Sequence, residues 1–574
     1  MAIKINSMIS RLGKHIKHLP WMDSKLLMLR RRLLSKLGGY PDWPKIISKD
    51  SSTWLNTLKK VDSHNKILIA TSIGSHLAAM QVESSLAVTL TMRKAEVHIL
   101  LCDGILPGCQ MCEPRFFPSS KSFAHDGPQK KLCRDCYGPA KKVYEQIGVK
   151  VHAYSDYLTV EEQLLAKKIA QQIPFDAIEQ FCFDGVNIGE HAKAGALRFF
   201  ARATLAEEPY ADQVLRRYLE AALLTAIATR NLLKLTNFTA AVFHHGIYVP
   251  QGIIGEVARQ QGVRVVNWNP AYRKNCFIFS HDDTYHHTLM NEPTSEWEDM
   301  PWSPERDEVI TSYLHSRWKG DNDWIYFQEN SYFEKDQILA EIGCNANKPI
   351  VGLLTNVMWD AQLHYPANAF TNMLEWLLYT VQWFEQHPNL QLVIRVHPAE
   401  IRGSVPTRQP VVDELHKYFK TLPANVFVVP PESNISTYVL SELCDSVIIY
   451  GTKTGVELTS VGIPVIVAGE AWIRNKGLTS DAENRDEYVK LLEKLPLKSR
   501  LSPELVQRAR KYAYHFFFRR MIPVTIFKQG PGWPPYRVAI KGLQELQPGG
   551  DLGIDCIADG ILFGTPFVYD AKQP

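Results

Sequence analysis

The stretch YGTKTGVELTSVGIPVIVAGE, which runs from Tyr450 to Glu470, decides the fold. The apolar run DSVII before it is typical of a buried parallel strand, GVELTSVG is typical of a short helix that ends at Gly462, and PVIV is typical of a second strand. Strand, small polar turn, helix and strand form the repeating unit of a doubly wound α/β domain. We therefore predict such a domain in this part of the chain.

The turn of this stretch predicts an anion site. It consists of Gly451, Thr452, Lys453, Thr454 and Gly455. Its glycines allow the backbone to approach a ligand, and the first N–H groups of the following helix point outward without an intrahelical partner. The two threonine hydroxyls add hydrogen-bond donors and the lysine adds a point charge, so the turn suits a phosphate. The alternative is an ordinary βα turn that binds nothing, because the pattern is neither GxGxxG nor GxxxxGK[ST].

The same alternation of strands and helices extends over both halves of the chain. In the first half, KILIATSIG and EVHILLCDG read as strands around a helix, and AAVFHHGIY, QGIIGEVARQQG and VRVVNW read as strand, helix and strand. In the second half the pattern restarts with KPIVGLLTN and continues with LQLVIRVHP and NVFVVPP. Two Rossmann-like domains in tandem bind ligands at the facing carboxyl ends of their strands, in a cleft.

These patterns divide the chain into five predicted segments. They are a basic N-terminal arm (1–50), an N-terminal Rossmann-like domain (51–300) with a cysteine-rich insert (102–137), a tryptophan-rich bridge of low regularity (301–344), a C-terminal Rossmann-like domain (345–500), and a closing helix with a C-terminal extension (501–574).

Composition excludes several classes of protein. The 574 residues, 45% hydrophobic and 22% charged, suit two globular cores, and a net charge of +4 over this length argues against a nucleic-acid binder. No apolar run reaches the length of a membrane span and no signal peptide is evident, so we expect a cytoplasmic protein. Nine Lys or Arg residues against one acidic residue between Met1 and Lys36 suit peripheral contact with the inner membrane; a solvated basic face or a disordered arm is the alternative.

Four of the ten cysteines form a metal-binding pattern. CQMC and CRDC are two CxxC pairs separated by twenty residues, and they supply Cys109, Cys112, Cys133 and Cys136. Cytosolic thiols stay reduced, so four thiolates at this spacing predict a closed tetrahedral zinc site that organises a polar loop. An iron–sulfur cluster on the same four residues is the alternative. The insert follows the strand end ILLCDG, where ligand loops lie, and we expect it to be structural.

Several motifs together indicate a family. They are RVHPAE (Arg395–Glu400), the turn of the quoted stretch, CDGILPGCQMCE, FDGVNIGEHA, HHGIYVPQG and FSHDDTYHHTL. Over roughly Lys66–Met521 the chain resembles the capsule polysaccharide biosynthesis glycosyltransferases of the GT-B fold, a bacterial group that includes capsule Kdo transferases. The resemblance implies a glycosyltransferase that moves a sugar from a nucleotide-sugar donor onto a surface or capsular polysaccharide or glycolipid. It also implies a C-terminal helix that crosses back to the first domain.

The resemblance assigns residues to the donor. His397 matches the histidine of an HP motif that contacts the donor's phosphate or nucleotide, and Arg395 stands in the same motif. The turn Gly451–Gly455 matches the phosphate-binding loop. Glu457 stands where a carboxylate contacts donor hydroxyls, although the second glutamate usual seven or eight residues later is missing.

The resemblance also implies a donor site without a catalytic metal, in which backbone dipoles and Lys453 neutralise the phosphate. The sequence holds no persuasive DxD motif. Asp321, Asn322 and Asp323 come closest to one, and we predict that they form a surface turn.

An inverting transfer requires a base for the acceptor hydroxyl. The resemblance implies that the first Rossmann-like domain binds the acceptor and the second binds the donor. The candidates in the acceptor half are Asp184, which ranks first, Glu190 and His245. Each has a structural alternative: Asp184 fixes a turn with Gly185, Glu190 starts a helix, and the histidine is a hydrogen-bonded core residue.

Two other functions remain open. The tandem domains could belong to a nucleotide-sugar epimerase. The missing second glutamate weakens this interpretation, because an epimerase needs acid and base carboxylates around the sugar. They could also form a non-catalytic sugar-nucleotide-binding subunit of a polysaccharide assembly complex.

Overall fold

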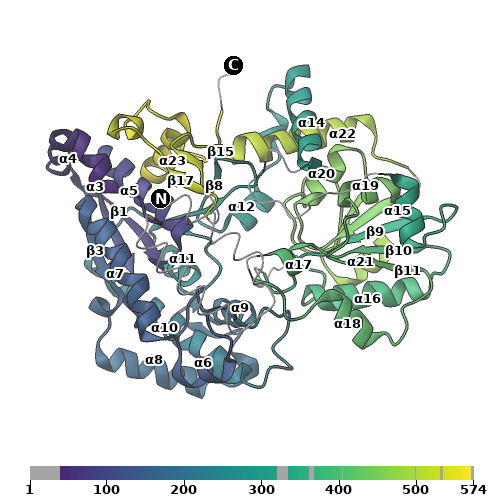
Figure 1. Ribbon diagram of the computed structural model, residues 1–574, viewed down its shortest axis with the longest axis horizontal. Coiled ribbons are helices and arrows are strands. Elements are labelled where there is room, and N and C mark those ends of the chain that lie inside the picture. Colours follow the sequence, from purple (N-terminus) through teal and green to yellow (C-terminus); the bar gives the residue numbers. More distant parts are fainter. Residues whose placement is uncertain are drawn as a thin grey trace, which may run out of the picture.

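The computed structural model describes residues 39–319, 323, 334–360, 367–403, 405–497, 499–530 and 534–570. The chain forms two α/β halves, each built around its own sheet (Figure 1). Most of the predicted basic arm, with its membrane contact, lies outside the described residues. Within the described ranges, no helix has both the length and the apolar character that crossing a bilayer requires.

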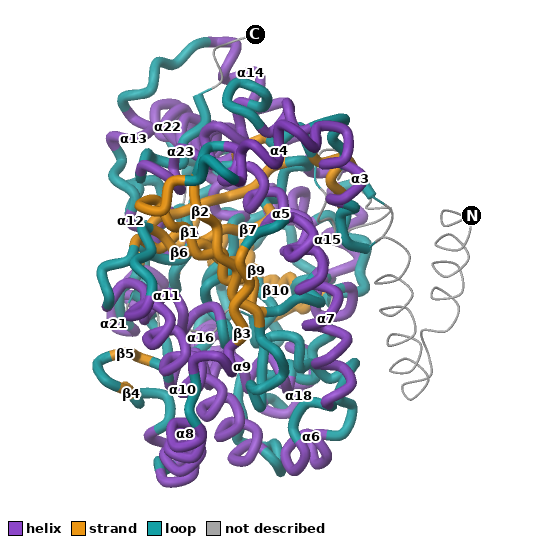
Figure 2. The backbone as a smooth tube through the Cα atoms, turned by 90° about the vertical axis from the view of Figure 1, so that its left-hand side faces the viewer, coloured by secondary structure: helices purple, strands orange, loops and turns teal. Residues whose placement is uncertain are grey.

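The first half is built on a seven-stranded sheet with the order β15-β8-β7-β6-β1-β2-β3. The strands from β7 to β3 are parallel, whereas β8 pairs antiparallel with both of its neighbours, β7 and the edge strand β15. Their cores are continuous aliphatic runs, as is usual where helices cover both faces of a sheet (Figure 2). The bounds are β1 (Asp62–Ser72), β2 (Ala95–Leu101), β3 (Lys150–Ala153), β6 (Ala240–His244), β7 (Arg264–Pro270), β8 (Cys276–His281) and β15 (Ile522–Pro523).

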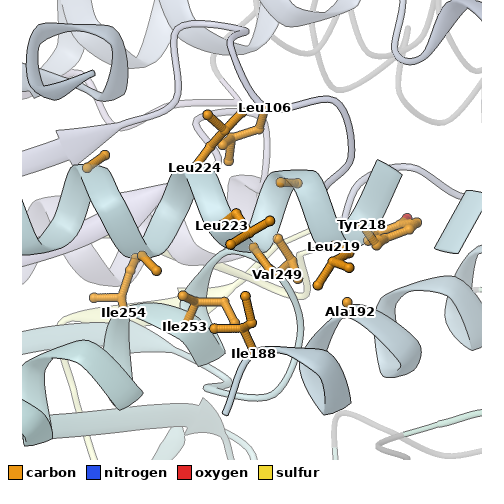
Figure 3. Packing of buried hydrophobic residues seen from close by; sticks show 14 of the residues in the cluster. Leu106, Ile188, Ala192, Tyr218, Leu219, Leu223, Leu224, Val249, Ile253 and Ile254 are labelled. Carbon is orange, nitrogen blue, oxygen red and sulfur yellow. The ribbon is translucent and has the colours of Figure 1, made fainter. Parts of the chain in front are cut away.

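Helices surround this sheet. The central one, α10, packs its leucines against Ile188, Val249 and Ile253 in the larger core cluster of this half (Figure 3). A small hairpin joins β4 (Cys182–Phe183) to β5 (Val186–Asn187). The helices are α3 (Trp43–Ile47), α4 (Ser51–Leu58), α5 (Leu77–Met92), α6 (Ser120–Asp126), α7 (Lys130–Ile147), α8 (Val160–Gln172), α9 (Gly189–Phe200), α10 (Ala211–Leu235) and α11 (Gln251–Gln260).

The second half is built on a six-stranded sheet with the order β11-β10-β9-β12-β13-β14, and all of its pairs are parallel. The quoted stretch follows β12 directly and forms a turn, the seven-residue helix α20 (Thr454–Ser460) and β13, as predicted. The strands are β9 (Ile350–Leu354), β10 (Gln391–Arg395), β11 (Val426–Val429), β12 (Ser446–Ile449), β13 (Val465–Val467) and β14 (Ser480–Asp481). The helices include α15 (Lys335–Ile342), α16 (Met373–Glu385), α17 (Ala399–Arg402), α18 (Val411–Tyr418), α19 (Thr437–Leu443) and α21 (Arg485–Leu492).

The end of the chain returns to the first half. Helix α22 (Pro503–Tyr514) continues into a π-helix (His515–Arg520), and β15 then pairs with β8. The hairpin β16 (Phe527–Gln529) and β17 (Tyr536–Val538) and the helix α23 (Leu552–Phe563) follow. Side chains of this segment, among them Phe527, Tyr536 and Ile557, lie in the core of the first half. The segment read as an extension is therefore part of that domain.

The bridge is more regular than the sequence indicates. It contains α14 (Pro304–Lys319) and α15 (Lys335–Ile342), and it is preceded by α12 (Tyr285–Asn291) and α13 (Ser295–Glu298). Ion pairs attach α13 and α14 to α22, among them Arg510 Nη1 to Asp307 Oδ2 at 2.9 Å. The low-regularity prediction is wrong here because α14 lacks a clear apolar stripe, the pattern by which a helix is found in a sequence.

Candidate functional site

The carboxyl ends of the two sheets meet at a boundary between the halves. The hydroxyl of Tyr248, four residues after β6, donates a hydrogen bond of 2.7 Å to Oδ1 of Asp360, which follows β9. Close by, Nζ of Lys453 lies 4.7 Å from the ring centroid of Tyr272, two residues after β7. Because doubly wound domains bind ligands at the carboxyl ends of their strands, this boundary is the candidate site.

The turn Gly451–Gly455 has a specific local structure. The Thr452 hydroxyl accepts a hydrogen bond from the N–H of Thr454 at 3.3 Å. One of the N–H groups that were predicted to point outward without a partner is therefore already bonded. A Cβ at Gly455 would lie 2.8 Å from the side chain of Ile449, so this glycine is required by packing against β12 rather than by a ligand. Because α20 has only seven residues, side chains are the main source of charge at this turn.

Lys453 reaches the boundary. Its side chain is 16% exposed, and Nζ lies 2.7 Å from Oε1 of Glu457 and over the ring of Tyr272. Burial, and then the charge of Arg317, lower the pKa of Lys453. The lysine is therefore a cation held at the meeting point of the halves, with an internal carboxylate beside it.

Glu457 is not directed at a ligand. Its side chain is 3% exposed, and Oε2 lies 3.2 Å from Nε of Arg317 while Oε1 meets Lys453. Burial raises the pKa of Glu457, but the charges of Arg317 and Lys453 outweigh this and hold the pKa at about 2. The placement does not favour the predicted contact with donor hydroxyls; Glu457 is instead the anion that anchors Lys453 beneath the turn.

Arg317 and Asp323 extend this ion network, and sequence reasoning missed both. The guanidinium of Arg317, on α14, pairs with Asp323, whose Oδ1 also accepts the Tyr313 hydroxyl at 2.9 Å. Asp323 is buried, so its prediction as part of a surface turn is wrong. The other two residues of that predicted turn, Asp321 and Asn322, lie outside the described residues. No local pattern marks Arg317, because its partner Glu457 lies in a distant part of the sequence.

Arg395 has a structural environment. Its buried guanidinium donates to the main-chain oxygens of Pro430 at 2.6 Å and Ser433 at 3.1 Å, and burial lowers its pKa to about 10. The arginine therefore holds the loop after β11, a placement that does not favour the predicted contact with the donor.

His397 fits the donor role better. Its Nδ1 accepts the N–H of Ala399 at 3.1 Å. Burial, and then the charges of Lys453 and Arg395, lower the pKa of His397 to about 4, so the ring is neutral at pH 7. A neutral imidazole that accepts at Nδ1 carries its proton on Nε2, and it can donate that proton to a phosphate oxygen.

Asp184 lies away from the boundary. It forms the tip of the β4–β5 hairpin with a φ of 49°, its side chain is 60% exposed, and Oδ2 accepts from Arg230 at 2.5 Å. Its main-chain oxygen contacts Gln260, the last residue of α11, whereas Tyr248 lies before the other end of that helix. The ten residues of α11, at a rise of 1.5 Å each, place Asp184 about 15 Å from Tyr248. The placement favours the turn-fixing role.

Of the other predicted bases, Glu190 occupies the first turn of α9 and accepts from Asn187 Nδ2 at 2.8 Å, which favours the helix-starting role. His245 directly follows β6 at the boundary, and its ring lies 5.0 Å from that of Tyr248. Burial, and then the charge of Arg198, lower the pKa of His245 to about 3. The structure thus brings His245, His397 and Lys453 to the boundary and leaves Asp184 outside it.

Helix α12 adds two histidines to the boundary. The ring of His286 stacks on Trp472 at 5.2 Å. His287 bonds to Asp283 at 3.0 Å and lies 3.4 Å from Glu470, which follows β13. Burial lowers the pKa of His287, but these two carboxylates outweigh it and raise the pKa to about 9. His287 is therefore a cation that joins the two halves.

The four predicted zinc ligands come from a loop and from α7. Sγ of Cys109 and Sγ of Cys112 are 3.8 Å apart. Cys133 and Cys136 lie one turn apart on α7, and the N–H of Ser75 donates to Sγ of Cys136 at 3.2 Å. Within the part of the chain that the structure describes, no three or more His, Cys, Asp or Glu side chains form a set that could hold a metal ion. The zinc site therefore stays a prediction.

The cysteine-rich insert contacts the boundary. The N–H of Gln110 donates to the main-chain oxygen of Val249 at 2.9 Å, in the loop after β6. Nε of Arg198 donates to the oxygen of Gln110 at 3.3 Å, and the guanidinium faces the rings of Tyr248 and Trp359 at 5.2 and 5.5 Å. The insert thus supports the loop that carries Tyr248.

Residues 311–512, from α14 to α22, match the family of capsule polysaccharide biosynthesis proteins. Over this range the chain is similar to that family. The match contains Arg317, His397 and Lys453, and so covers the whole second-half side of the boundary.

Comparison with solved structures gives distant similarities. The beta Kdo 2,4 transferase KpsC of Thermosulfurimonas dismutans is 13% identical, with 48% of this chain and 79% of that chain covered and a TM-score of 0.29. The beta Kdo 2,7 transferase KpsC of the same organism is 15% identical, with 50% and 79% covered and a TM-score of 0.29. The UDP-GlcNAc 2-epimerase of Neisseria meningitidis is 10% identical, with 79% and 99% covered and a TM-score of 0.26. A search of the curated proteins gave no match.

Proposed function

We propose that the protein is a glycosyltransferase of the GT-B type, which moves a sugar from a nucleotide-sugar donor onto a capsular or surface polysaccharide or glycolipid. The observation that carries the proposal is the placement of Lys453 and His397 at the carboxyl ends of the second sheet, facing the first half, inside the family match. The second half binds the donor and the first half binds the acceptor.

Four side chains of the second half would receive the donor phosphate. Lys453 supplies the positive charge, His397 supplies an Nε2–H donor, and the Thr452 and Thr454 hydroxyls, 3.1 Å apart, supply further donors. Glu457 keeps Lys453 extended toward the boundary and remains neutralised by Arg317 when Lys453 turns to a phosphate. The charge of the leaving phosphate grows during transfer, so these groups stabilise the transition state more than the ground state.

A panel of UDP-, GDP-, CMP- and dTDP-linked sugars tests the proposal. We expect one of them to raise the unfolding temperature of the protein and to lose its sugar slowly to water. Return of an isomeric nucleotide sugar would indicate an epimerase, and binding without any reaction would indicate a non-catalytic subunit.

We also propose that Cys109, Cys112, Cys133 and Cys136 bind one structural zinc ion. The 3.8 Å between Sγ of Cys109 and Sγ of Cys112 equals the edge of a tetrahedron whose Zn–S distance is about 2.3 Å. The N–H of Ser75 on Sγ of Cys136 is a contact that stabilises a metal-bound thiolate. Metal analysis of anaerobically purified protein should find one zinc per chain. Iron together with sulfide would indicate an iron–sulfur cluster in place of zinc, and the absence of any metal would contradict the proposed site.

A further inference from the structure

Asp360 occupies a position that the sequence does not single out. It follows β9 in the second half, and its side chain is exposed, yet Oδ1 accepts the hydroxyl of Tyr248 from the first half at 2.7 Å. Tyr248 is itself buried and packs against the guanidinium of Arg198. An exposed carboxylate is thus held by a fixed phenol between the donor half and the acceptor half.

Groups from both halves surround this carboxylate. Its charge acts on Tyr272, Tyr285 and His286 of the first half and on His397 of the second. His397 is the residue assigned to the donor phosphate. Asp360 therefore lies on the side of the donor site that faces the acceptor half, where an acceptor hydroxyl would approach the sugar.

We propose that Asp360 is the general base that removes the proton from the acceptor hydroxyl, with Tyr248 as the positioning residue that holds its carboxylate. This inference rests on the proposed function. His245, which also lies at the boundary, is less suited: it is half-buried, and the charge of Arg198 opposes its protonation. The hydroxyl of Tyr248 donates to Oδ1 and so fixes the orientation of the carboxylate.

The step is a direct displacement with inversion. The acceptor O–H bond breaks and its proton moves to a carboxylate oxygen of Asp360. The acceptor oxygen forms a bond to the anomeric carbon, and the bond between that carbon and the phosphate oxygen breaks. The electron pair leaves with the nucleotide, whose charge Lys453 and His397 stabilise.

The test measures release of nucleotide from the active donor of the panel, with water as the acceptor, in the Asp360→Ala variant. We expect release at least about a hundredfold slower than in the wild type, because general base catalysis contributes a factor of roughly 10²–10⁴. Sodium azide should restore release and give a glycosyl azide, because azide attacks without losing a proton. Tyr248→Phe should slow release with water about tenfold and leave release with azide unchanged. Asp336→Asn, an exposed aspartate of the same half, is the matched control.

Each outcome decides one point. Wild-type release by Asp360→Ala, or a loss that azide does not restore, overturns the assignment while the proposed function stands. If His245→Gln loses nucleotide release and azide restores it, and Asp360→Ala shows no such effect, His245 is the base. If no donor of the panel binds to the wild type or is consumed by it, the proposed function is wrong, and the assignment of Asp360 as the general base is wrong as well.

Discussion

Replacing Lys453 with alanine tests the donor site at its most charged group. The lysine contributes one of the two cations on Glu457, and Arg317 keeps the carboxylate neutralised after the substitution, so the fold should survive. A charge-assisted hydrogen bond to a phosphate is worth about 1.5–3 kcal/mol, which corresponds to a donor affinity roughly tenfold to a hundredfold weaker. Lys453→Arg should recover only part of this loss, because a planar fork does not replace a point charge in a tight turn.

The assay is thermal or urea unfolding with donor at a hundred times the wild-type dissociation constant. Donor should stabilise the wild type by about 2.7 kcal/mol, a tenfold weaker variant by about 1.4 kcal/mol and a hundredfold weaker one by about 0.4 kcal/mol. Lys420→Ala, an exposed lysine of the same half, is the control and should match the wild type. Full stabilisation of Lys453→Ala by donor would remove this turn from the site and leave it an ordinary βα turn.

Three further predictions follow from the ion network and the placement of the candidates. Glu457→Gln should lower the free energy of unfolding by about 3–5 kcal/mol, because it leaves buried cations without their anion, whereas Glu341→Gln on the surface should not. Since the pKa of folded Glu457 is about 2, its contribution to wild-type stability should be present above pH 4.5 and lost as the pH falls toward 2; urea titrations at each pH measure both effects. His287, with its pKa raised to about 9, should stabilise the fold below pH 6.5 and lose this contribution as the pH rises to 9, so unfolding of His287→Gln should depend less on pH over that interval. Asp184→Asn should release nucleotide at the wild-type rate; a loss of a hundredfold or more would return Asp184 to the mechanism.

The alternation of apolar runs predicts both parallel sheets because each strand and helix is a local pattern. Strand β15 and helix α23 could not be placed from such patterns. Strand β15 pairs through only two residues, Ile522 and Pro523, and nothing in the sequence shows against which element the apolar helix α23 packs. They join the first half only because α22 carries the chain back across the boundary.

The candidate site was predictable only in part. The HP motif and the turn with Lys453 are local patterns, and both lie at the boundary. Glu457 was assigned to the ligand because a pattern shows which residue is acidic and not which cations surround it. Arg317 and Asp360 reach the site through tertiary contacts alone. Asp184 ranks first for its loop, but its hairpin contacts Arg230 of α10 and Gln260 at the far end of α11.

The central claim is that Lys453 and His397 together receive the phosphate of a nucleotide sugar. Release of nucleotide from the donor panel, followed by mass spectrometry in the wild type and in the Lys453→Ala/His397→Ala double variant, tests it most directly. We predict release from one donor by the wild type and loss of that release in a double variant that still unfolds cooperatively. Release at the same rate by both proteins, or release from no donor by the wild type, would contradict the account.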